Sequence, residues 1–274
     1  MTDVSSAPGL LAGRVALVSG AGPGLGRATA LALARHGADI ALAARRLENL
    51  ESVGAEIAAL GRRVVWCETD ITDAGECERV VARAVDELGR LDIVVNNAHR
   101  GGSNHPFVET FGMTAGDDAA DAWHEAMDVN LWGSLTMTRS AIEPMREQGG
   151  GRVVMIGTMA VRDVRAGQGP YAISKAALIQ AARSLAVELG PSGIRVNAVL
   201  PGYIRGAAVE SWMAAEAERR GVDLSVVEAD LASSTALGSI PTEDEVAGTI
   251  VWLASDLALP VTGQTIDVNA GQWL

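Results

Sequence analysis

Short apolar segments rich in β-branched residues alternate with longer segments of helical periodicity along most of this chain. The first apolar segment, residues 14–19, leads through a glycine-rich turn into an alanine- and leucine-rich segment that Gly37 ends. Parallel strands need long crossover connections, so strands that alternate with helices of about ten or more residues indicate βαβ units. The sequence therefore predicts an α/β fold, with a doubly wound parallel sheet, helices on both faces and right-handed connections. The seven expected strands are residues 14–19, 39–44, 63–67, 91–96, 151–157, 194–200 and 263–268, and the expected helices are residues 27–37, 47–60, 73–88, 118–148, 170–189 and 243–255.

The segment between Gly202 and Pro241 interrupts this alternation. It contains two short helical patterns, residues 207–220 and 225–233, between the sixth strand and the last helix. Insertions at the carboxyl end of a sheet strand usually shape a binding crevice, so we expect residues 203–240 to form a small helical substrate lid. No linker rich in Pro, Gly or Ser divides the chain. We therefore predict a flexible tail over residues 1–12 and a single domain over residues 13–274.

Composition argues against several classes of partner. The net charge of −12 is unfavourable for binding nucleic acid or an anionic membrane surface. The N-terminus lacks the pattern of a signal peptide, and no stretch approaches the roughly 18 apolar residues of a membrane span. Cys67 and Cys77 have neither metal-ligand spacing nor the density of a disulfide framework. We expect a cytoplasmic protein with reduced thiols and no metal, nucleic-acid or membrane partner.

A glycine-rich turn lies between the first strand and the first helix. Glycines there let a pyrophosphate approach the main chain without a Cβ in the way, and the following helix directs its N-terminal amides at the anion. The spacing is not the G-x-G-x-x-G fingerprint of dinucleotide-binding proteins, and an ordinary glycine-rich turn is the alternative. The residues expected to bind the pyrophosphate are Gly20, Gly22, Pro23, Gly24, Leu25 and Gly26.

Two arginines follow the second expected strand and bear on which dinucleotide is bound. An acidic residue at this place would accept hydrogen bonds from the ribose 2′-hydroxyl of NAD, whereas arginine pairs with the 2′-phosphate of NADP. The chain has Arg45 and Arg46 here, and no acid until Glu48. We therefore predict NADP, with NAD possible, Arg45 as the leading contact and Arg46 as its helper. The alternative is a pair of solvated arginines that open a helix.

Tyr171 and Lys175 are spaced four residues apart within an expected helix. That spacing puts both side chains on one face, one turn from each other. An ammonium beside a phenol favours the phenolate and lowers a pKa that starts near ~10. A tyrosine so placed can move a proton at neutral pH, although the same spacing also occurs in helices by chance.

Together these residues resemble the short-chain dehydrogenase/reductase family, in its compact single-domain branch. The resemblance covers about residues 14–271 and implies a single Rossmann-like domain, a nicotinamide cofactor and a homotetramer. Besides the glycine turn and the Tyr171/Lys175 pair, it rests on Asp70-Ile71, Asn96-Asn97-Ala98, Asn130, Pro201-Gly202, Thr262-Gly263-Gln264 and Val268-Asn269-Ala270-Gly271, in this order.

The resemblance implies a catalytic tetrad. Tyr171 is then the general acid/base, Lys175 lowers its pKa and binds the nicotinamide ribose, and Asn130 holds a water that links Lys175 to solvent. The family's usual serine is replaced by Thr158, whose hydroxyl can donate the same hydrogen bond to a substrate carbonyl while its methyl narrows the pocket. A structural threonine is the alternative.

The resemblance also extends the cofactor site beyond the turn and the arginines. It implies contacts from Asp70, Ile71, Asn97, Ala98, Tyr171, Lys175, Pro201 and Gly202. Two positions depart from the family pattern. His99 stands where a glycine is usual, and we assign it no catalytic role. A threonine that often follows the Pro-Gly pair is absent, so we expect backbone groups of Ile204 to bind the nicotinamide carboxamide.

Other candidates concern the substrate pocket and the assembly. Arg162 and Arg165 follow Thr158 and could clamp a carboxylate or phosphate, or could be solvated. The apolar candidates for the pocket lining are Met159, Phe107, Trp212 and Met213, and the candidates for burial against a neighbouring subunit are Trp273 and Leu274.

The sequence thus predicts an NAD(P)-dependent oxidoreductase that interconverts a secondary alcohol and a ketone of a small-molecule substrate by hydride transfer, with NADP favoured. Two other functions remain open: a non-catalytic dinucleotide-binding redox sensor, and a lyase or isomerase on the same scaffold.

Overall fold

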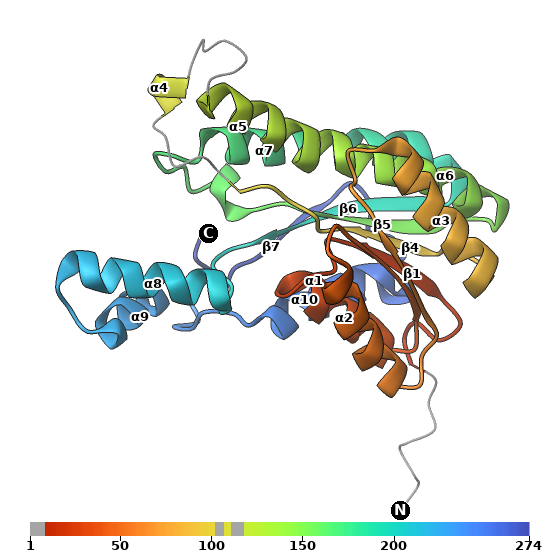
Figure 1. Ribbon diagram of the computed structural model, residues 1–274, viewed down its shortest axis with the longest axis horizontal. Helices are drawn as coiled ribbons and strands as arrows, with labels where there is room; N and C mark the ends of the chain where they lie inside the picture. The colour runs from red at the N-terminus through yellow and green to blue at the C-terminus, as the bar shows by residue number, and fades with distance from the viewer. Residues whose placement is uncertain (1–8, 102–106, 111–117, 274) are drawn as a thin grey trace, which may run out of the picture.

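The computed structural model of the protein describes residues 9–101, 107–110 and 118–273. Its centre is one sheet of seven parallel strands in the order β3-β2-β1-β4-β5-β6-β7 (Figure 1). Each strand lies within two residues of its predicted bounds, so the predicted doubly wound sheet is confirmed. The strands are β1 (Val15–Ser19), β2 (Asp39–Ala44), β3 (Val64–Glu68), β4 (Ile93–Asn96), β5 (Gly151–Ile156), β6 (Ile194–Pro201) and β7 (Thr265–Val268).

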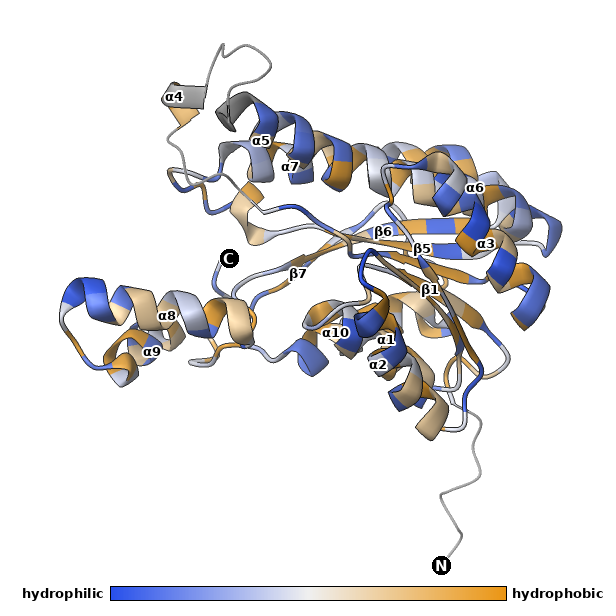
Figure 2. Cartoon of the chain, in the orientation of Figure 1, coloured by the Kyte–Doolittle hydropathy of each residue, from blue (hydrophilic) through white to orange (hydrophobic). Residues whose placement is uncertain are grey.

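Helices cover both faces of the sheet, and each face has its own apolar core. Successive residues of β1 belong to opposite cores: Leu17 packs into one and Val18 into the other, as the two-residue period of a strand requires. Figure 2 shows hydrophobic residues gathered along the strands between the two helical layers. The helices are α1 (Leu25–Arg35), α2 (Leu47–Ala59) and α10 (Glu243–Ala254) on one face, and α3 (Ala74–Leu88), α6 (Ser134–Glu147) and α7 (Gly169–Leu189) on the other.

The long helix predicted over residues 118–148 is wrong as a continuous α-helix. The structure has α5 (Asp118–Met127), a π-helical segment η2 (Asp128–Gly133) and then α6. Two residues of η2 are closely packed. Asn130 is fully buried, and Gly133 packs so closely on Ile71 that a Cβ on Gly133 would lie 2.6 Å from Ile71 Cγ1. A π-helical turn holds one extra residue, and such turns are frequent at functional sites.

The predicted lid segment folds as two packed helices, α8 (Ala207–Arg220) and α9 (Leu224–Ser233). They lie beyond the carboxyl ends of the strands, to one side of the main body (Figure 1). Their apolar residues form a third, small core that is separate from the two cores of the sheet. Its buried members are Met213, Ala217, Val227, Leu231 and Ile240.

The predicted tail falls mostly on residues 1–8, which lie outside the described residues. Leu11, inside the same predicted range, is buried, and its N–H donates to His36 O at 2.8 Å. The ordered fold therefore includes Leu11. No helix within the described ranges is long and apolar enough to cross a membrane.

Candidate active site

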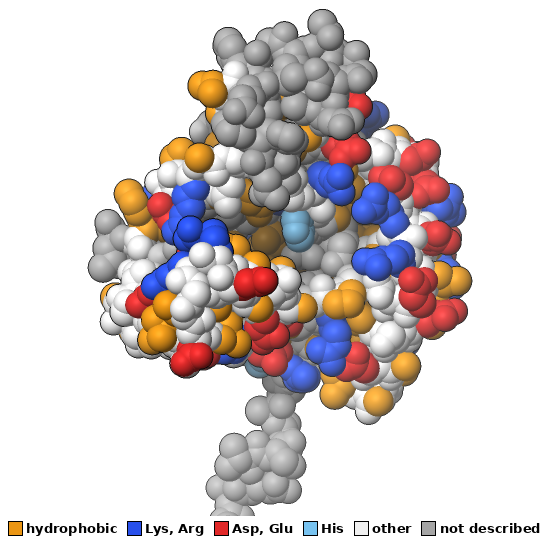
Figure 3. All heavy atoms as spheres, turned by 60° about the vertical axis from the view of Figure 1, so that its left-hand side comes forward, with side chains coloured by type: hydrophobic (Ala, Val, Ile, Leu, Met, Phe, Trp, Pro, Cys, Tyr) orange, Lys and Arg blue, Asp and Glu red, His pale blue; other side chains and the backbone are white. Residues whose placement is uncertain are grey.

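A cavity opens where the carboxyl ends of β1 and β4 lie side by side. The strand order reverses at this point, with β2 and β3 on one side and β5, β6 and β7 on the other. Ligands of open α/β sheets bind in such crevices. The cavity has a volume of about 510 Å³, and Figure 3 shows a hollow there with a histidine side chain inside it. It is lined by most of the predicted cofactor residues: Gly20, Gly22, Pro23, Gly24, Leu25, Gly26, Arg45, Arg46, Asp70, Ile71, Asn97, Ala98 and Ile204. We call it the cofactor cavity.

The glycine turn is as tight as the main chain allows. A Cβ on Gly26 would lie 2.0 Å from Gly20 O, and one on Gly20 would lie 2.6 Å from Ala98 Cα. Gly24 has φ 100° and ψ −151°, a conformation that is open to glycine alone. Because α1 begins directly afterwards, its first amides face the cavity with no side chain in between.

Asn97 holds this turn against β4. Its Nδ2 donates to Gly20 O at 2.9 Å, while the preceding Asn96 is fully buried and donates from Nδ2 to Thr138 Oγ1 at 2.9 Å. Asn97 was predicted to contact the cofactor. Asn97 lines the cofactor cavity, and its side-chain amide is also tied to the turn.

Positive charge lies at one end of the cofactor cavity. Arg45 and Arg46 follow β2, are exposed, and form no ion pair with any residue that the structure describes. Asp70 lies in the same cavity, and its pKa is lowered chiefly by the hydrogen bond from Thr72 N at 3.0 Å and to a smaller extent by the charge of Arg45. Two guanidinium groups are therefore available to an anionic ligand here.

Tyr171 and Thr158 meet beside this cavity. Thr158 follows β5, and its Oγ1 accepts from Ala160 N at 3.2 Å at the start of the short helix η3 (Met159–Val161). Tyr171 lies in the first turn of α7, and its phenol forms a hydrogen bond with the Thr158 side chain. Lys175 follows one turn later, with 1% of its surface exposed, and donates from Nζ to Ile156 O at 2.7 Å.

The predicted effect of Lys175 on the Tyr171 pKa is wrong. Burial raises the pKa of the Tyr171 phenol, and the hydrogen bond with Thr158 opposes this rise only in part. Burial also lowers the pKa of Lys175 to about 7. The charge that was expected to favour the phenolate is itself desolvated, and the amine is directed at the carbonyl of Ile156.

The Asn130 side chain makes three hydrogen bonds within the protein. Its Oδ1 accepts from Arg100 N at 2.8 Å, and its Nδ2 donates to Arg100 O at 3.0 Å and to Ser174 Oγ at 2.9 Å. Both amide protons are therefore in use. The side chain ties the segment after β4 to α7, and a water held by this residue would need its main-chain carbonyl.

His99 lies in the cofactor cavity with its ring centroid 6.4 Å from that of Tyr171. Its Nδ1 is 3.4 Å from Asn97 O. Burial, and then the charge of Lys175, lower the pKa of the ring below its ordinary value. His99 was expected to have no catalytic role, and it lies at the junction between the cavity and Tyr171.

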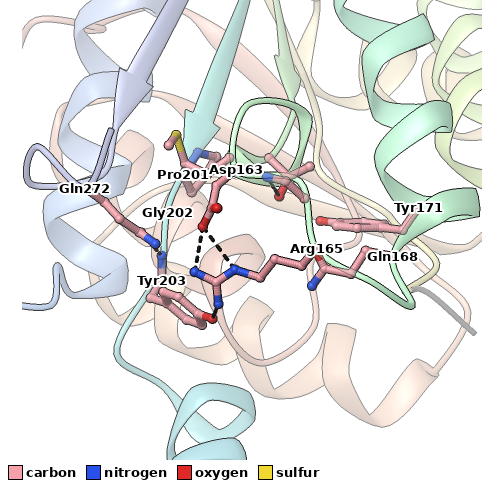
Figure 4. A pocket seen from close by; sticks show the side chains of 11 residues that line it. Asp163, Arg165, Gln168, Tyr171, Pro201, Gly202, Tyr203 and Gln272 are labelled. Carbon is pink, nitrogen blue, oxygen red and sulfur yellow. Dashed lines mark hydrogen bonds and ion pairs between the residues drawn. The ribbon is translucent and has the colours of Figure 1, made fainter. Parts of the chain in front are cut away.

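A second pocket lies on the other side of Tyr171, and we call it the substrate pocket. Its volume is about 100 Å³, and Figure 4 shows the Arg165 side chain reaching across it toward Asp163 and Tyr203. The predicted residues Pro201 and Gly202 line this pocket rather than the cofactor cavity. The full lining is Thr158, Met159, Ala160, Asp163, Arg165, Gln168, Tyr171, Pro201, Gly202, Tyr203 and Gln272.

The structure separates the remaining candidates for this pocket. Met159 and Arg165 line it, whereas Arg162 points elsewhere and pairs with Asp267 at 3.0 Å. Trp212 stacks on Tyr203 with the ring centroids 5.3 Å apart, behind the lining. Two further candidates are absent from the lining: Phe107 packs edge-on against Trp123, and Met213 is buried in the small core of α8 and α9. Of the two candidates for a subunit contact, Trp273 is 48% exposed. Leu274 lies outside the described residues.

Several residues that line the two sites were not predicted from the sequence. Glu243, at the start of α10, faces the glycine turn, and its Oε1 lies 3.6 Å from where a Cβ on Gly24 would be. Burial raises the pKa of its carboxyl group. Asn49 in α2 also lines the cofactor cavity. In the substrate pocket the missed residues are Asp163, Gln168, Tyr203 and Gln272. A signal existed for Asp163 and Gln168, which lie between Thr158 and Tyr171.

Known proteins resemble this chain over nearly its full length. A family model described as enoyl-(acyl carrier protein) reductase matches residues 20–272. The short-chain reductase protein NovJ of Streptomyces niveus is 36% identical, with 94% of this chain and 93% of that protein covered. The L-rhamnose 1-dehydrogenase (NAD(P)(+)) of a Sphingomonas strain is 33% identical, with 97% and 98% covered. The crystal structure of carveol dehydrogenase from Mycobacterium avium in complex with NAD matches with a TM-score of 0.87 at 29% identity, with 96% of this chain and 99% of that chain covered.

Proposed function

The chain belongs to the short-chain dehydrogenase/reductase family, and on that premise we propose that it interconverts a secondary alcohol and a ketone with a nicotinamide dinucleotide, NADP being preferred. The observation that carries the proposal is the meeting of two hydroxyl groups, of Thr158 and Tyr171, between a glycine-lined cavity and a small pocket.

The residues of the cofactor cavity fit a dinucleotide. The glycine turn leaves no room for a Cβ at Gly20 or Gly26, so the main-chain amides at the start of α1 are open to a pyrophosphate. The exposed Arg45 and Arg46 form no ion pair with the residues that the structure describes, and they fit a 2′-phosphate. When bound, the nicotinamide cofactor supplies or accepts the hydride.

The chain's own side chains orient the substrate oxygen and move its proton. The Thr158 hydroxyl donates to that oxygen and holds it beside Tyr171. In ketone reduction Tyr171 Oη donates its proton to the oxygen, and in alcohol oxidation it accepts the proton. The raised pKa of the phenol keeps it protonated at neutral pH, which suits the reduction. Lys175 lies one turn away, and its pKa of about 7 suits a group that returns the proton.

Replacing the phenol tests this function. In Tyr171→Phe we expect turnover of ketones and alcohols, followed at the nicotinamide absorbance with NAD and NADP in parallel, to fall about 10³-fold. Cofactor affinity, measured by fluorescence titration, should stay within a few-fold because Tyr171 lies outside the cofactor cavity. Wild-type protein that changed no nicotinamide absorbance with any ketone or alcohol would contradict the proposal. Dinucleotide binding under those conditions would favour a sensor.

We also propose a homotetramer, as the family resemblance implies. Trp273, 48% exposed on the single chain, is the residue expected to be covered by a neighbour. Sedimentation of the wild type and of Trp273→Ser tests this expectation.

A further inference from the structure

The substrate pocket is lined by polar side chains that are only partly committed to one another. Asp163, Arg165 and Gln168 come from the segment between Thr158 and Tyr171, and Gln272 comes from the C-terminal segment. We propose, on the basis of the function above, that the substrate is a small neutral polyol or its hydroxyketone. The hydroxyl groups next to its reacting carbon then bind to Asp163, Gln168 and Gln272.

The charge of the pocket excludes an anion as the preferred substrate. Arg165 donates from Nε at 3.0 Å and from Nη2 at 2.5 Å to the same oxygen, Asp163 Oδ2. It also donates from Nη1 to the Tyr203 hydroxyl, and its guanidinium lies over the Tyr203 ring at 5.3 Å from the centroid. The guanidinium charge is thus matched by a carboxylate that lines the same pocket. A carboxylate or phosphate on the substrate would meet Asp163 as well as Arg165.

The uncommitted groups suit hydroxyls, which both donate and accept hydrogen bonds. Asp163 Oδ1 accepts no hydrogen bond from the described residues, and the Gln168 side-chain amide has no partner among them. Gln272 Oε1 accepts from Tyr203 N at 3.3 Å, whereas Gln272 Nε2 has no hydrogen-bond partner among the described residues. One carboxylate oxygen and two amides can therefore bind neighbouring hydroxyl groups.

The same groups act against an apolar substrate. A site built to bind hydroxyls loses those hydrogen bonds when an analogue without them enters, and its own polar groups are then left unpaired.

The pocket is also small, at about 100 Å³ against about 510 Å³ for the cofactor cavity. Tyr203, fixed between Arg165 and the stacked Trp212, forms one wall. A small substrate with several hydroxyl groups fits this combination of size and polarity.

The test compares three substrate classes matched in chain length: a linear four- to six-carbon polyol or hydroxyketone, a secondary alcohol or ketone without further hydroxyls, and a hydroxy or keto acid. The readout is kcat/KM at the nicotinamide absorbance with the full-length protein. We expect the polyol class to exceed both others by about 100-fold or more. A higher value for the apolar alcohol or for the acid would overturn the substrate class and leave the proposed function standing. No turnover with any class would overturn the proposed function, and this inference with it.

A variant pair ties the preference to the pocket. In Gln168→Leu we expect kcat/KM for the polyol to fall about tenfold, mainly through KM, while the value for the apolar alcohol is unchanged or rises. The variant should fold, because the side-chain amide that it removes has no partner in the described chain. Arg162→Gln is the matched control, since Arg162 pairs with Asp267 outside the pocket, and it should keep both values. An equal loss for both substrates in Gln168→Leu would contradict the assignment.

Discussion

The cofactor cavity and the substrate pocket share Tyr171 as a neighbour but are built from different parts of the chain. The cavity is shaped by main chain at the ends of β1, β2 and β4, in places where a Cβ would collide with backbone atoms. The pocket is shaped by side chains of residues 158–171, 201–203 and 272, several of which keep uncommitted polar groups. Under the proposed function, the cofactor would therefore be held mainly by the shape of the main chain, and the substrate by side chains that can be replaced one at a time.

The largest effect should come from adding a methyl group to the glycine turn. In Gly26→Ala the Cβ would lie 2.0 Å from Gly20 O, so the backbone must move. We expect the free energy of unfolding to fall by about 3 kcal/mol or more, and cofactor affinity at least about 100-fold. Chemical denaturation and fluorescence titration measure both. Gly22→Ala is the control, because its Cβ would meet only Asn49 Nδ2, at 3.4 Å, and stability should change little. A Gly26→Ala variant that was stable and bound the cofactor normally would contradict the claim that close main-chain packing shapes the cofactor cavity.

A smaller effect, confined to turnover, is expected on the substrate side. In Thr158→Val the hydroxyl that bonds Tyr171 is lost, and we expect kcat/KM to fall about 100-fold. Thr158→Ser keeps the hydroxyl and should stay within a few-fold of the wild type. Cofactor affinity should be the same in all three proteins, because Thr158 does not line the cofactor cavity. Near-full turnover by Thr158→Val would remove this residue from the mechanism.

The arginines after β2 bring positive side-chain charge to the cofactor cavity. In Arg45→Asp we expect the Kd for NADP to rise about 10- to 100-fold, with a smaller change for NAD. Arg139→Asp, at an exposed position of α6 on the other face of the sheet, makes the same change of net charge and serves as the control. Unchanged NADP binding in Arg45→Asp would remove Arg45 from the cofactor site.

The smallest effect concerns the pH dependence of stability. Burial lowers the pKa of Lys175 to about 7 in the folded protein, from an ordinary value of 10.5. Between these values the unfolded state binds more protons, so the free energy of unfolding rises with pH, by at most about 1.4 kcal/mol per pH unit from this group. Lys175→Met removes this contribution. The wild-type stability minus the variant stability, from denaturant unfolding, should therefore increase from pH 7 to pH 9. A difference that is independent of pH would contradict the desolvation of Lys175.

The catalytic helix shows where sequence patterns reach their limit. The spacing of Tyr171 and Lys175 correctly places both on α7, but the pKa of each depends on burial. Lys175 is 1% exposed and bonds to Ile156 at the end of β5, on a helix that packs against β5 and η2, and no local sequence pattern reports such burial. Asn130 likewise was placed in a helix, whereas the π-helical turn and its bonds to Arg100 and Ser174 arise from packing between segments far apart in the chain.

The sequence by itself determined the alternation of strands and helices, the parallel sheet, the glycine turn and the set of residues around the cofactor. These follow from local periodicity and from steric rules that act within a few residues. Only the tertiary structure decided that Arg165 lies in the substrate pocket while Arg162 pairs with Asp267, and that Gln272 and Glu243 reach the site. The physical reason is that the direction of a loop side chain, and the burial that sets its charge, depend on contacts with segments about 100 residues away, as in the Arg162–Asp267 pair.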